Sequence, residues 1–173
     1  MIFNETKIKG AYVIQSKKFQ DERGSFDTIW ENKFFEKHGL NSKLFECNIS
    51  FNKKKGTLRG MHYQIPPFEG SKLVRCIKGK TFDVILDLRE DSKTFKQWIG
   101  TELSAENGMM NYIPEGCAHG FQTLDDDAEV LYLMSQIYNP ESARVAHWND
   151  EEFGISWPLK PTIISKKDSL YNS

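Results

Sequence analysis

A short run of the sequence concentrates polar side chains that could do chemistry. Residues 56–64 read GTLRGMHYQ, which places Arg59, His62 and Gln64 close together, and Lys72 follows soon after. An imidazole has an ordinary pKa of about 6.5, so it can take up or release a proton near neutral pH, and neighbouring cations favour an anionic ligand. The run indicates an acid–base site for such a ligand; a hydrogen-bonded structural histidine is the alternative.

The spacing of Arg59 and His62 sets a condition on the backbone. Side chains alternate between the two faces of a strand, so residues three apart point to opposite faces. If both side chains line one pocket, Gly60 must mark a bulge or a twist.

A second run, residues 113–121, reads IPEGCAHGF and contributes His119. Two histidines from separate strands raise the possibility of a metal site, since metal-binding cupins supply His-x-His and a glutamate from one motif and a further histidine from another. Here the first motif is His62-Tyr63-Gln64, with glutamine in place of the second histidine, although Glu69 and His119 could still serve as ligands. We therefore expect acid–base chemistry with no bound metal.

The run of residues 129–138 could form a wall of the same site. A period of two divides it into two faces, both of which we expect to be largely buried. One face carries Val130, Tyr132, Met134, Gln136 and Tyr138, and the other carries Leu131, Leu133 and Ile137. Because a small antiparallel barrel can hold one ligand inside, this strand is a candidate pocket wall; tyrosines that pack with their hydroxyls at the rim are the alternative.

The carboxylate that would orient a catalytic histidine is not identified by the residue pattern. A histidine base needs such a partner, and a tyrosine can supply a proton from another direction. Asp168 lies in the run ISKKD, and on its surroundings alone it is a solvated charge beside Lys166 and Lys167.

The elements that must position these residues are mostly short strands. The runs KLVRCIKG and TFDVILDLR meet at Lys78-Gly79-Lys80, which predicts a hairpin turn, and further alternating runs span residues 98–103 and 109–113. Only the segment from Trp30 to His38, closed by Gly39, predicts a helix. Short strands at this spacing favour a sandwich or a jelly-roll barrel. One face of the second run carries Phe82, Val84, Leu86 and Leu88.

Composition limits the classes of protein that fit. The chain has 173 residues and no Pro/Gly/Ser linker, so we expect a single domain over 1–173. A net charge of −1 lacks the basic field that nucleic-acid binders use, and no stretch approaches the ~18 apolar residues of a membrane span. The three cysteines have no C-x-x-C spacing, and the first residues lack the pattern of a signal peptide. We expect a cytoplasmic protein with no nucleic-acid or membrane partner.

Seven separated blocks carry a resemblance to a known family. In chain order they are LRGMHYQ, KLVRCIKGKTFDVILDLR, ELSAEN, IPEGCAHGF, VLYLMSQIYNP, HWNDEEFGISWP and ISKKD. The sequence resembles the dTDP-4-dehydrorhamnose 3,5-epimerase family from Asp21 almost to its end. The resemblance implies an all-β, cupin-like antiparallel jelly-roll barrel with one or two short helices, assembled as a homodimer. It also implies inversion at carbons 3 and 5 of a nucleotide-linked 4-keto-6-deoxy sugar, with neither cofactor nor metal, in dTDP-rhamnose and polysaccharide biosynthesis.

The same resemblance implies roles for individual residues. His62 corresponds to the base, Asp168 to its orienting partner, Tyr132 to the acid on the opposite face of the sugar, and Lys72 to the cation that stabilises the enolate oxygen. Tyr138 corresponds to the aromatic residue on which the nucleotide base stacks. The remaining substrate-binding positions implied are Arg23, Phe26, Asn48, Arg59, Gln64, His119 and its partner Asp83.

Some positions depart from the family pattern. Glu46-Cys47-Asn48 replaces a common Gln-Asp-Asn, Thr28 stands where glutamate is common, and Leu133 where lysine is frequent. These departures leave open the nucleotide, the sugar and the number of inverted carbons. The alternatives are a single-site 3- or 5-epimerase, a 3,4-ketoisomerase, a catalytically silent sugar-nucleotide binding protein and a metal-dependent cupin dioxygenase.

Overall fold

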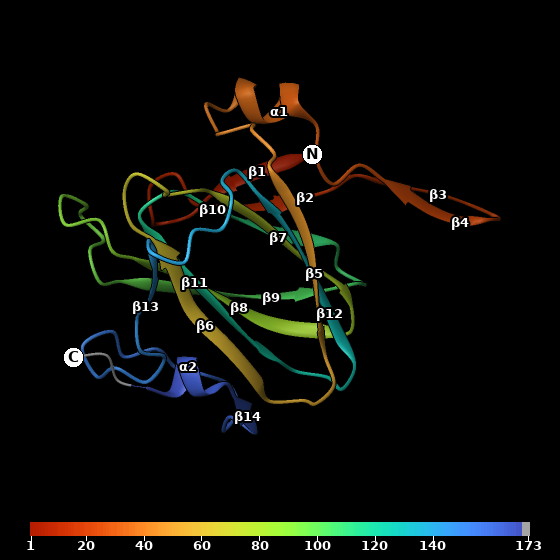
Figure 1. Ribbon diagram of the computed structural model, residues 1–173. Helices are drawn as coiled ribbons and strands as arrows, with labels where there is room; N and C mark the ends of the chain where they lie inside the picture. Colours follow the sequence, from red (N-terminus) through yellow and green to blue (C-terminus); the bar gives the residue numbers. More distant parts are fainter. Residues whose placement is uncertain (171–173) are drawn as a thin grey trace.

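The computed structural model describes residues 1–170, and these residues form two facing β-sheets with few helices (Figure 1). The first sheet has the order β1 (Ile2–Glu5), β2 (Tyr12–Gln15), β10 (Met109–Ile113), β7 (Lys72–Lys78), β12 (Ala128–Met134) and β5 (Glu46–Asn52). The second has the order β13 (Ala143–Val145), β6 (Thr57–Gln64), β11 (Cys117–Thr123), β8 (Lys80–Asp87) and β9 (Trp98–Ser104), with β14 (Ile163–Ile164) beside β6.

All strand pairs in these sheets are antiparallel except β14 with β6. The two helices are short: α1 covers Asn32–Lys37 and α2 covers Lys166–Ser169. The prediction of an all-β, cupin-like jelly roll with one or two short helices is confirmed, and α1 lies inside the segment expected to be helical. Among residues 1–170, no helix is long and apolar enough to cross a membrane.

A separate hairpin projects from the two sheets. It consists of β3 (Lys18–Asp21) and β4 (Gly24–Asp27), which pair only with each other, and it extends to the right in Figure 1. At its base, Arg75 of β7 forms an ion pair with Asp27 at 2.8 Å. The hairpin is thus anchored to the first sheet at one end and free at its tip.

The predicted hairpin at Lys78-Gly79-Lys80 is wrong, although a turn lies there. β7 pairs with β10 and β12 in the first sheet, whereas β8 pairs with β9 and β11 in the second. Gly79 has a φ of +71°, which a residue without Cβ adopts readily, so the chain turns a corner from one sheet to the other. Alternation along two runs shows that both are strands, but it does not show that they are partners.

Three apolar clusters hold the layers together. The central one lies between the sheets and includes Val74, Ile85, Phe121 and Val130. A second cluster packs Phe35 of α1 against the outer face of the first sheet. The third covers the outer face of the second sheet, where the face predicted to carry Phe82, Val84, Leu86 and Leu88 packs with Trp98, Phe153 and Trp157.

Candidate active site

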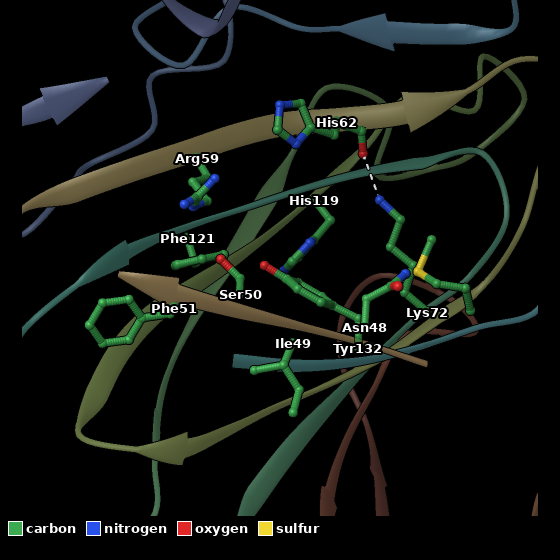
Figure 2. A pocket seen from close by; sticks show the side chains of 11 residues that line it. Asn48, Ile49, Ser50, Phe51, Arg59, His62, Lys72, His119, Phe121 and Tyr132 are labelled. Atoms are coloured by element: carbon green, nitrogen blue, oxygen red, sulfur yellow. Dashed lines mark hydrogen bonds between the residues drawn. The ribbon is translucent and has the colours of Figure 1, made fainter. Parts of the chain in front are cut away.

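One end of the space between the sheets is open and polar. It forms a cleft of about 500 Å³ whose walls come from β5, β6, β7, β11 and β12. Figure 2 shows that His62 and Tyr132 enter it from opposite walls, His62 on β6 of one sheet and Tyr132 on β12 of the other. The lining residues are Asn48, Ile49, Ser50, Phe51, Arg59, His62, Lys72, His119, Phe121, Tyr132 and Met134.

A bulge at Gly60 brings Arg59 and His62 to the same cleft. His62 stands opposite His119 and Arg59 opposite Phe121, so β6 has one residue more than β11 over this stretch. Gly60 has a φ of +130°, and a Cβ there would lie 2.5 Å from the Cα of Gly120. The bulge expected from the spacing of Arg59 and His62 is confirmed, and it requires the two strands to approach as only glycines allow.

His62 is held by a buried carboxylate. Its Nε2 lies 2.7 Å from Oδ1 of Asp168, which is itself buried. Burial raises the pKa of Asp168, but hydrogen bonds from His62, the backbone N–H of Gly60 and Ser165 outweigh it, so the pKa lies below its ordinary value. The ionised carboxylate accepts from Nε2–H, which leaves the lone pair of the ring on Nδ1.

The helix α2 supplies this carboxylate. The Ser165 side chain accepts a hydrogen bond from the backbone N–H of Asp168 at 3.1 Å and so caps the helix. The expectation from the pattern alone, that Asp168 is a solvated charge, is wrong. The short helix turns its side chain inward against β6, while the neighbouring Lys166 and Lys167 remain exposed.

Lys72 lies between the two walls. Its Nζ donates to the backbone oxygen of His62 at 3.0 Å, the contact drawn in Figure 2. Burial lowers the pKa of Lys72 to about 8, and the nearby charge of Asp83 limits that fall. A lysine in this setting is a cation whose charge is poorly solvated and available to a developing anion.

The Tyr132 side chain lies near the rings of His119 and Phe121 and near the hydroxyl of Ser50. His119 meets its ring edge to face at 6.2 Å, and Phe121 lies 6.3 Å away. Burial raises the pKa of Tyr132 to about 12, an effect that Ser50 and Arg59 reduce only in part. The phenol therefore stays protonated at neutral pH and can donate.

A second histidine–aspartate pair supports the floor of the cleft. His119 Nε2 lies 2.7 Å from Oδ2 of Asp83, and Asn111 donates to the other oxygen at 2.8 Å. Asp83 is fully buried and does not line the cleft, so it reaches a ligand only through His119. Arg59, which does line it, donates from Nε to Asn52 at 2.7 Å.

A second pocket, of about 340 Å³, adjoins the first. The two share Arg59, His62, Lys72 and Met134, so they form one groove. β12 ends at Met134, which corrects the expectation that Tyr138 continues the strand; Tyr138 instead lies in the segment after it and lines the second pocket. Beyond the strand, the backbone N–H groups of residues 137–139 donate to side-chain oxygens.

The sequence interpretation missed several residues of this groove. Arg144 and Lys167 line the second pocket, and Ser50 lines the first. Ser50 belongs to a strand with no chemical motif, and Arg144 follows a turn. Lys167 sits beside Asp168 in the block ISKKD and could have been found from that block.

Four predicted substrate-binding residues differ in where the structure places them. Asn48 lines the first pocket. Gln64 lines the second, but its Nε2 donates to the backbone oxygen of Phe68 at 2.7 Å and its Oε1 accepts from the backbone N–H of Asn139 at 2.7 Å, so its amide holds the chain itself. Arg23 and Phe26 lie on the projecting hairpin, outside the groove of their own chain, with 85% of the Arg23 side chain and 70% of Phe26 exposed.

Metal-ligating side chains are not grouped in the part of the chain that the structure describes. Within residues 1–170, no cluster of three or more histidine, cysteine, aspartate or glutamate side chains could hold an ion. Both site histidines are instead bonded to a single carboxylate each.

Known proteins resemble this chain over nearly its full length. A family model described as dTDP-4-dehydrorhamnose 3,5-epimerase matches residues 5–173. A protein of that name from Salmonella typhimurium is 43% identical, covering 98% of this chain and 93% of its own.

Solved structures resemble the fold as well. The 3,5-epimerase from Legionella pneumophila in complex with dTDP-4-keto-L-rhamnose has a TM-score of 0.91 and 38% identity, and the match covers 96% of this chain and 89% of the other. A 3'-monoepimerase from Streptomyces bikiniensis in complex with dTDP-quinovose has a TM-score of 0.89 and 30% identity, with 95% of this chain and 84% of the other covered.

Proposed function

The chain belongs to the dTDP-4-dehydrorhamnose 3,5-epimerase family and is an enzyme of the epimerase class, and from that premise we propose how it acts. The substrate is a dTDP-linked 4-keto-6-deoxy sugar, which is inverted at C3, C5 or both through an enolate and without a cofactor. The observation that carries the proposal is that His62 and Tyr132 face one cleft from two different sheets. Inversion needs a base on one face of the sugar and an acid on the other.

His62 is the base. The ketone at C4 acidifies the C–H bonds on both sides, because the carbanion charge moves onto oxygen. Nδ1 of His62 removes the proton, and the ionised Asp168 at Nε2 stabilises the imidazolium that forms. The partial exposure of the His62 side chain within the groove supports this role.

Lys72 stabilises the oxygen of the enolate. Its ammonium lies beside His62 and lines both pockets, so a keto group placed between base and lysine meets a poorly solvated positive charge. One preorganised partner of a developing oxyanion contributes about 100- to 1,000-fold in rate.

Tyr132 returns the proton from the opposite side. Its phenol is protonated at neutral pH because its pKa is raised to about 12. After the enolate is protonated by Tyr132, a proton from solvent replaces the one lost by the phenol, and His62 releases its proton to water. The cycle involves no redox change, and it returns His62 and Tyr132 to their starting protonation states.

The second pocket takes the nucleotide. Tyr138 offers an exposed ring for the base, and Arg59, Arg144 and Lys167 supply cations for the diphosphate. Because both pockets meet at His62 and Lys72, a nucleotide bound in the second places its sugar in the first.

The active unit is a homodimer in which Arg23 and Phe26 of the partner subunit complete the groove. These residues lie on a hairpin that is anchored at Asp27 and exposes the rings of Phe19 and Phe26, which face each other near its base. Edge strand β5 exposes Ile49 and Phe51 beside the first pocket. Two such apolar surfaces favour contact with a second copy.

We also place the enzyme in the cytoplasm, since its three cysteines are free.

A single-site 3-epimerase is the second candidate. The monoepimerase from Streptomyces bikiniensis is 30% identical and shares the fold, so the family relation does not fix how many carbons are inverted. The two candidates differ in whether C5 also exchanges.

Deuterium incorporation tests the proposal. The enzyme is incubated with a dTDP-4-keto-6-deoxy sugar in D₂O, and NMR locates the deuterium and the configuration of each carbon. Deuterium at C3 and C5 with inversion at both supports the 3,5-epimerase, and deuterium at C3 alone supports the single-site enzyme. In Tyr132→Phe, exchange through His62 survives while net inversion falls. A wild-type enzyme that leaves both positions protiated would contradict the proposal.

A dimer test uses two inactive variants. His62→Ala and Arg23→Ala proteins are mixed after mild dissociation, and a mixed dimer has one groove that contains both His62 and the partner's arginine. Recovery of activity above either variant alone is expected. No recovery from a mixture shown by mass spectrometry to contain mixed dimers would contradict the shared site.

A further inference from the structure

The segment that carries Tyr138 is held by side chains rather than by a strand. Beyond the end of β12, three consecutive backbone N–H groups donate to side-chain oxygens. Ile137 donates to Gln136 at 3.0 Å, Tyr138 to Glu46 at 2.9 Å and Asn139 to Gln64 at 2.7 Å. The position of the Tyr138 backbone is thus set by residues remote from it in the sequence.

Gln64 uses its whole amide on this task. While Oε1 accepts from Asn139, Nε2 donates to the backbone oxygens of Ile137 at 3.2 Å and Phe68 at 2.7 Å. The side chain therefore grips the segment at a donor and an acceptor on either side of Tyr138, and it ties both to the loop after β6.

Glu46 holds the same segment from the other sheet. Oε1 accepts from the N–H of Tyr138, and Oε2 accepts from the side chain of Asn48 at 3.1 Å. These two hydrogen bonds keep the pKa of Glu46 below its ordinary value, so it is a carboxylate at neutral pH. One carboxylate thus links Tyr138 in the second pocket with Asn48 in the first.

We propose that Glu46 and Gln64 are positioning residues that clamp the Tyr138 segment, residues 136–139, from the two sheets and thereby set the affinity for the nucleotide. The inference rests on the proposed function, in which Tyr138 is the platform for the base. Glu46 is on β5 and Gln64 on β6, at the ends of strands from opposite sheets, so the clamp spans the mouth of the groove.

Exposure explains why such a clamp is needed. Tyr138 is 57% exposed, so packing restrains its ring little before the nucleotide arrives. A platform that must be ordered on binding weakens affinity, whereas one already held in place does not. Anchoring the backbone on both sides of Tyr138 reduces the freedom that binding would otherwise remove.

Binding of dTDP alone isolates this effect, because dTDP lacks the sugar that the proposed function places in the first pocket, which Asn48 lines. Calorimetry compares the wild type with Glu46→Ala, Gln64→Ala and Glu46→Gln. Glu46→Ala removes one hydrogen bond to the segment and should bind dTDP about 2- to 12-fold more weakly, the ratio for one such bond; Gln64→Ala removes two and should weaken binding at least as much. Glu46→Gln keeps an oxygen for the N–H of Tyr138 and should bind within about twofold of the wild type. The matched control is Glu141→Ala, which removes an exposed carboxylate close to the segment in the sequence and should leave the affinity for dTDP unchanged.

Double variants separate positioning from direct contact. Tyr138→Ala alone should weaken dTDP binding by about 5- to 150-fold, the range of one base–aromatic stack. If Glu46 and Gln64 act through Tyr138, adding Glu46→Ala or Gln64→Ala to Tyr138→Ala should cost less than about twofold more. Full additivity would show that the side chain contacts the nucleotide itself and would overturn the positioning role.

Amide hydrogen exchange reads the clamp without any ligand. The N–H of Tyr138 should exchange faster in Glu46→Ala and that of Asn139 in Gln64→Ala, while the amides of β11 keep their protection. If wild type and Tyr138→Ala differ in dTDP affinity but both clamp variants bind and exchange like the wild type, the inference fails while the proposed function stands. If the wild type itself does not bind dTDP, the proposed function has failed first. The clamp is supported if dTDP binding weakens in the alanine variants only when Tyr138 is present, stays near the wild-type level in Glu46→Gln, and is accompanied by faster amide exchange at Tyr138 or Asn139.

Discussion

The two histidine–aspartate pairs have the same bond and different surroundings. In each pair Nε2 lies 2.7 Å from a carboxylate oxygen, yet 41% of the His62 side chain is exposed and only 5% of that of His119. An exposed imidazole beside a ligand groove can exchange protons with a substrate, whereas a buried one mainly fixes the shape of the wall. A histidine–carboxylate contact therefore identifies a base only when the imidazole also has access to the groove.

The carboxylates differ in a related way. Asp83 is on β8, beside β11, and is also bonded to Asn111, so it belongs to the interior of the fold. Asp168 is separated from His62 by 106 positions and comes from a short helix near the end of the chain. The His119–Asp83 pair thus joins neighbouring strands inside a sheet, whereas the His62–Asp168 pair joins a strand to a short helix near the end of the chain.

Replacing His62 should have the largest effect. His62→Ala should lower kcat by about 100- to 10,000-fold, because a positioned general base contributes that much. His119→Asn should cost less, since it removes no group that takes the substrate proton. Steady-state kinetics on a dTDP-4-keto-6-deoxy sugar measure kcat for both variants. Equal decreases in kcat would show that the two pairs do not differ in their role in catalysis.

Replacing Asp168 should impair the same catalytic step as replacing His62. Asp168→Ala should lower kcat strongly, but the double variant with His62→Ala should be little worse than His62→Ala alone, because both residues serve one task. The corresponding double variant at His119 and Asp168 should instead show losses that multiply. Multiplying losses for His62 with Asp168 would show that Asp168 acts elsewhere.

Lys72 predicts a fall in rate at high pH. With a pKa of about 8, the ammonium of Lys72 loses its proton as the pH rises past 8, and the rate loses up to about 100- to 1,000-fold of oxyanion stabilisation.

The contribution of Lys72 to the free energy of unfolding should instead become more favourable as the pH rises. A lysine whose folded pKa is below its unfolded value of ~10.4 opposes folding at low pH, and that penalty disappears as the pH rises from about 8 to about 10.4.

The pH–rate profile of Lys72→Arg provides the control for this assignment. Guanidinium remains charged throughout this range, so the basic limb near pH 8 should be absent even though the altered geometry lowers the rate. A limb of unchanged position in Lys72→Arg would assign it to another group.

The buried pair should matter most for stability. Asp83→Ala leaves the N–H groups of His119 and Asn111 without their acceptor, which should lower the free energy of unfolding by about 1–3 kcal/mol in urea titrations. The control Glu90→Ala, at an exposed carboxylate on a loop, should be neutral. If Asp83→Ala were as stable as the control, the pair would have no structural role.

The sequence predicted features that local patterns encode. Alternation identified β7, β8, β9, β10 and β12, and Gly60 was the expected site of a bulge if Arg59 and His62 line one cleft, as they do. Which strands are partners depends on contacts distant in the sequence, so the turn at Gly79 was mistaken for a hairpin.

The site was harder to predict where its residues come from irregular segments. Asp168 has lysines beside it and looks solvated until α2 turns it inward, so only the family resemblance pointed to it. Tyr138 continues the alternating pattern in the sequence, but the strand has ended before it, and its segment is hydrogen-bonded to the side chains of Glu46 and Gln64. Neither the register of a terminal helix nor the capture of a loop by distant side chains is written in a local pattern.

The most direct test compares deuterium wash-in at the carbons beside the keto group for His62→Asn and His119→Asn, each incubated with the dTDP-linked 4-keto-6-deoxy sugar in D₂O and followed by NMR. If His62 is the base, wash-in should be abolished in His62→Asn at both C3 and C5, whereas His119→Asn should still exchange at a measurable rate. Wash-in at the wild-type rate in His62→Asn, or its loss in His119→Asn alone, would show that His62 is not the base.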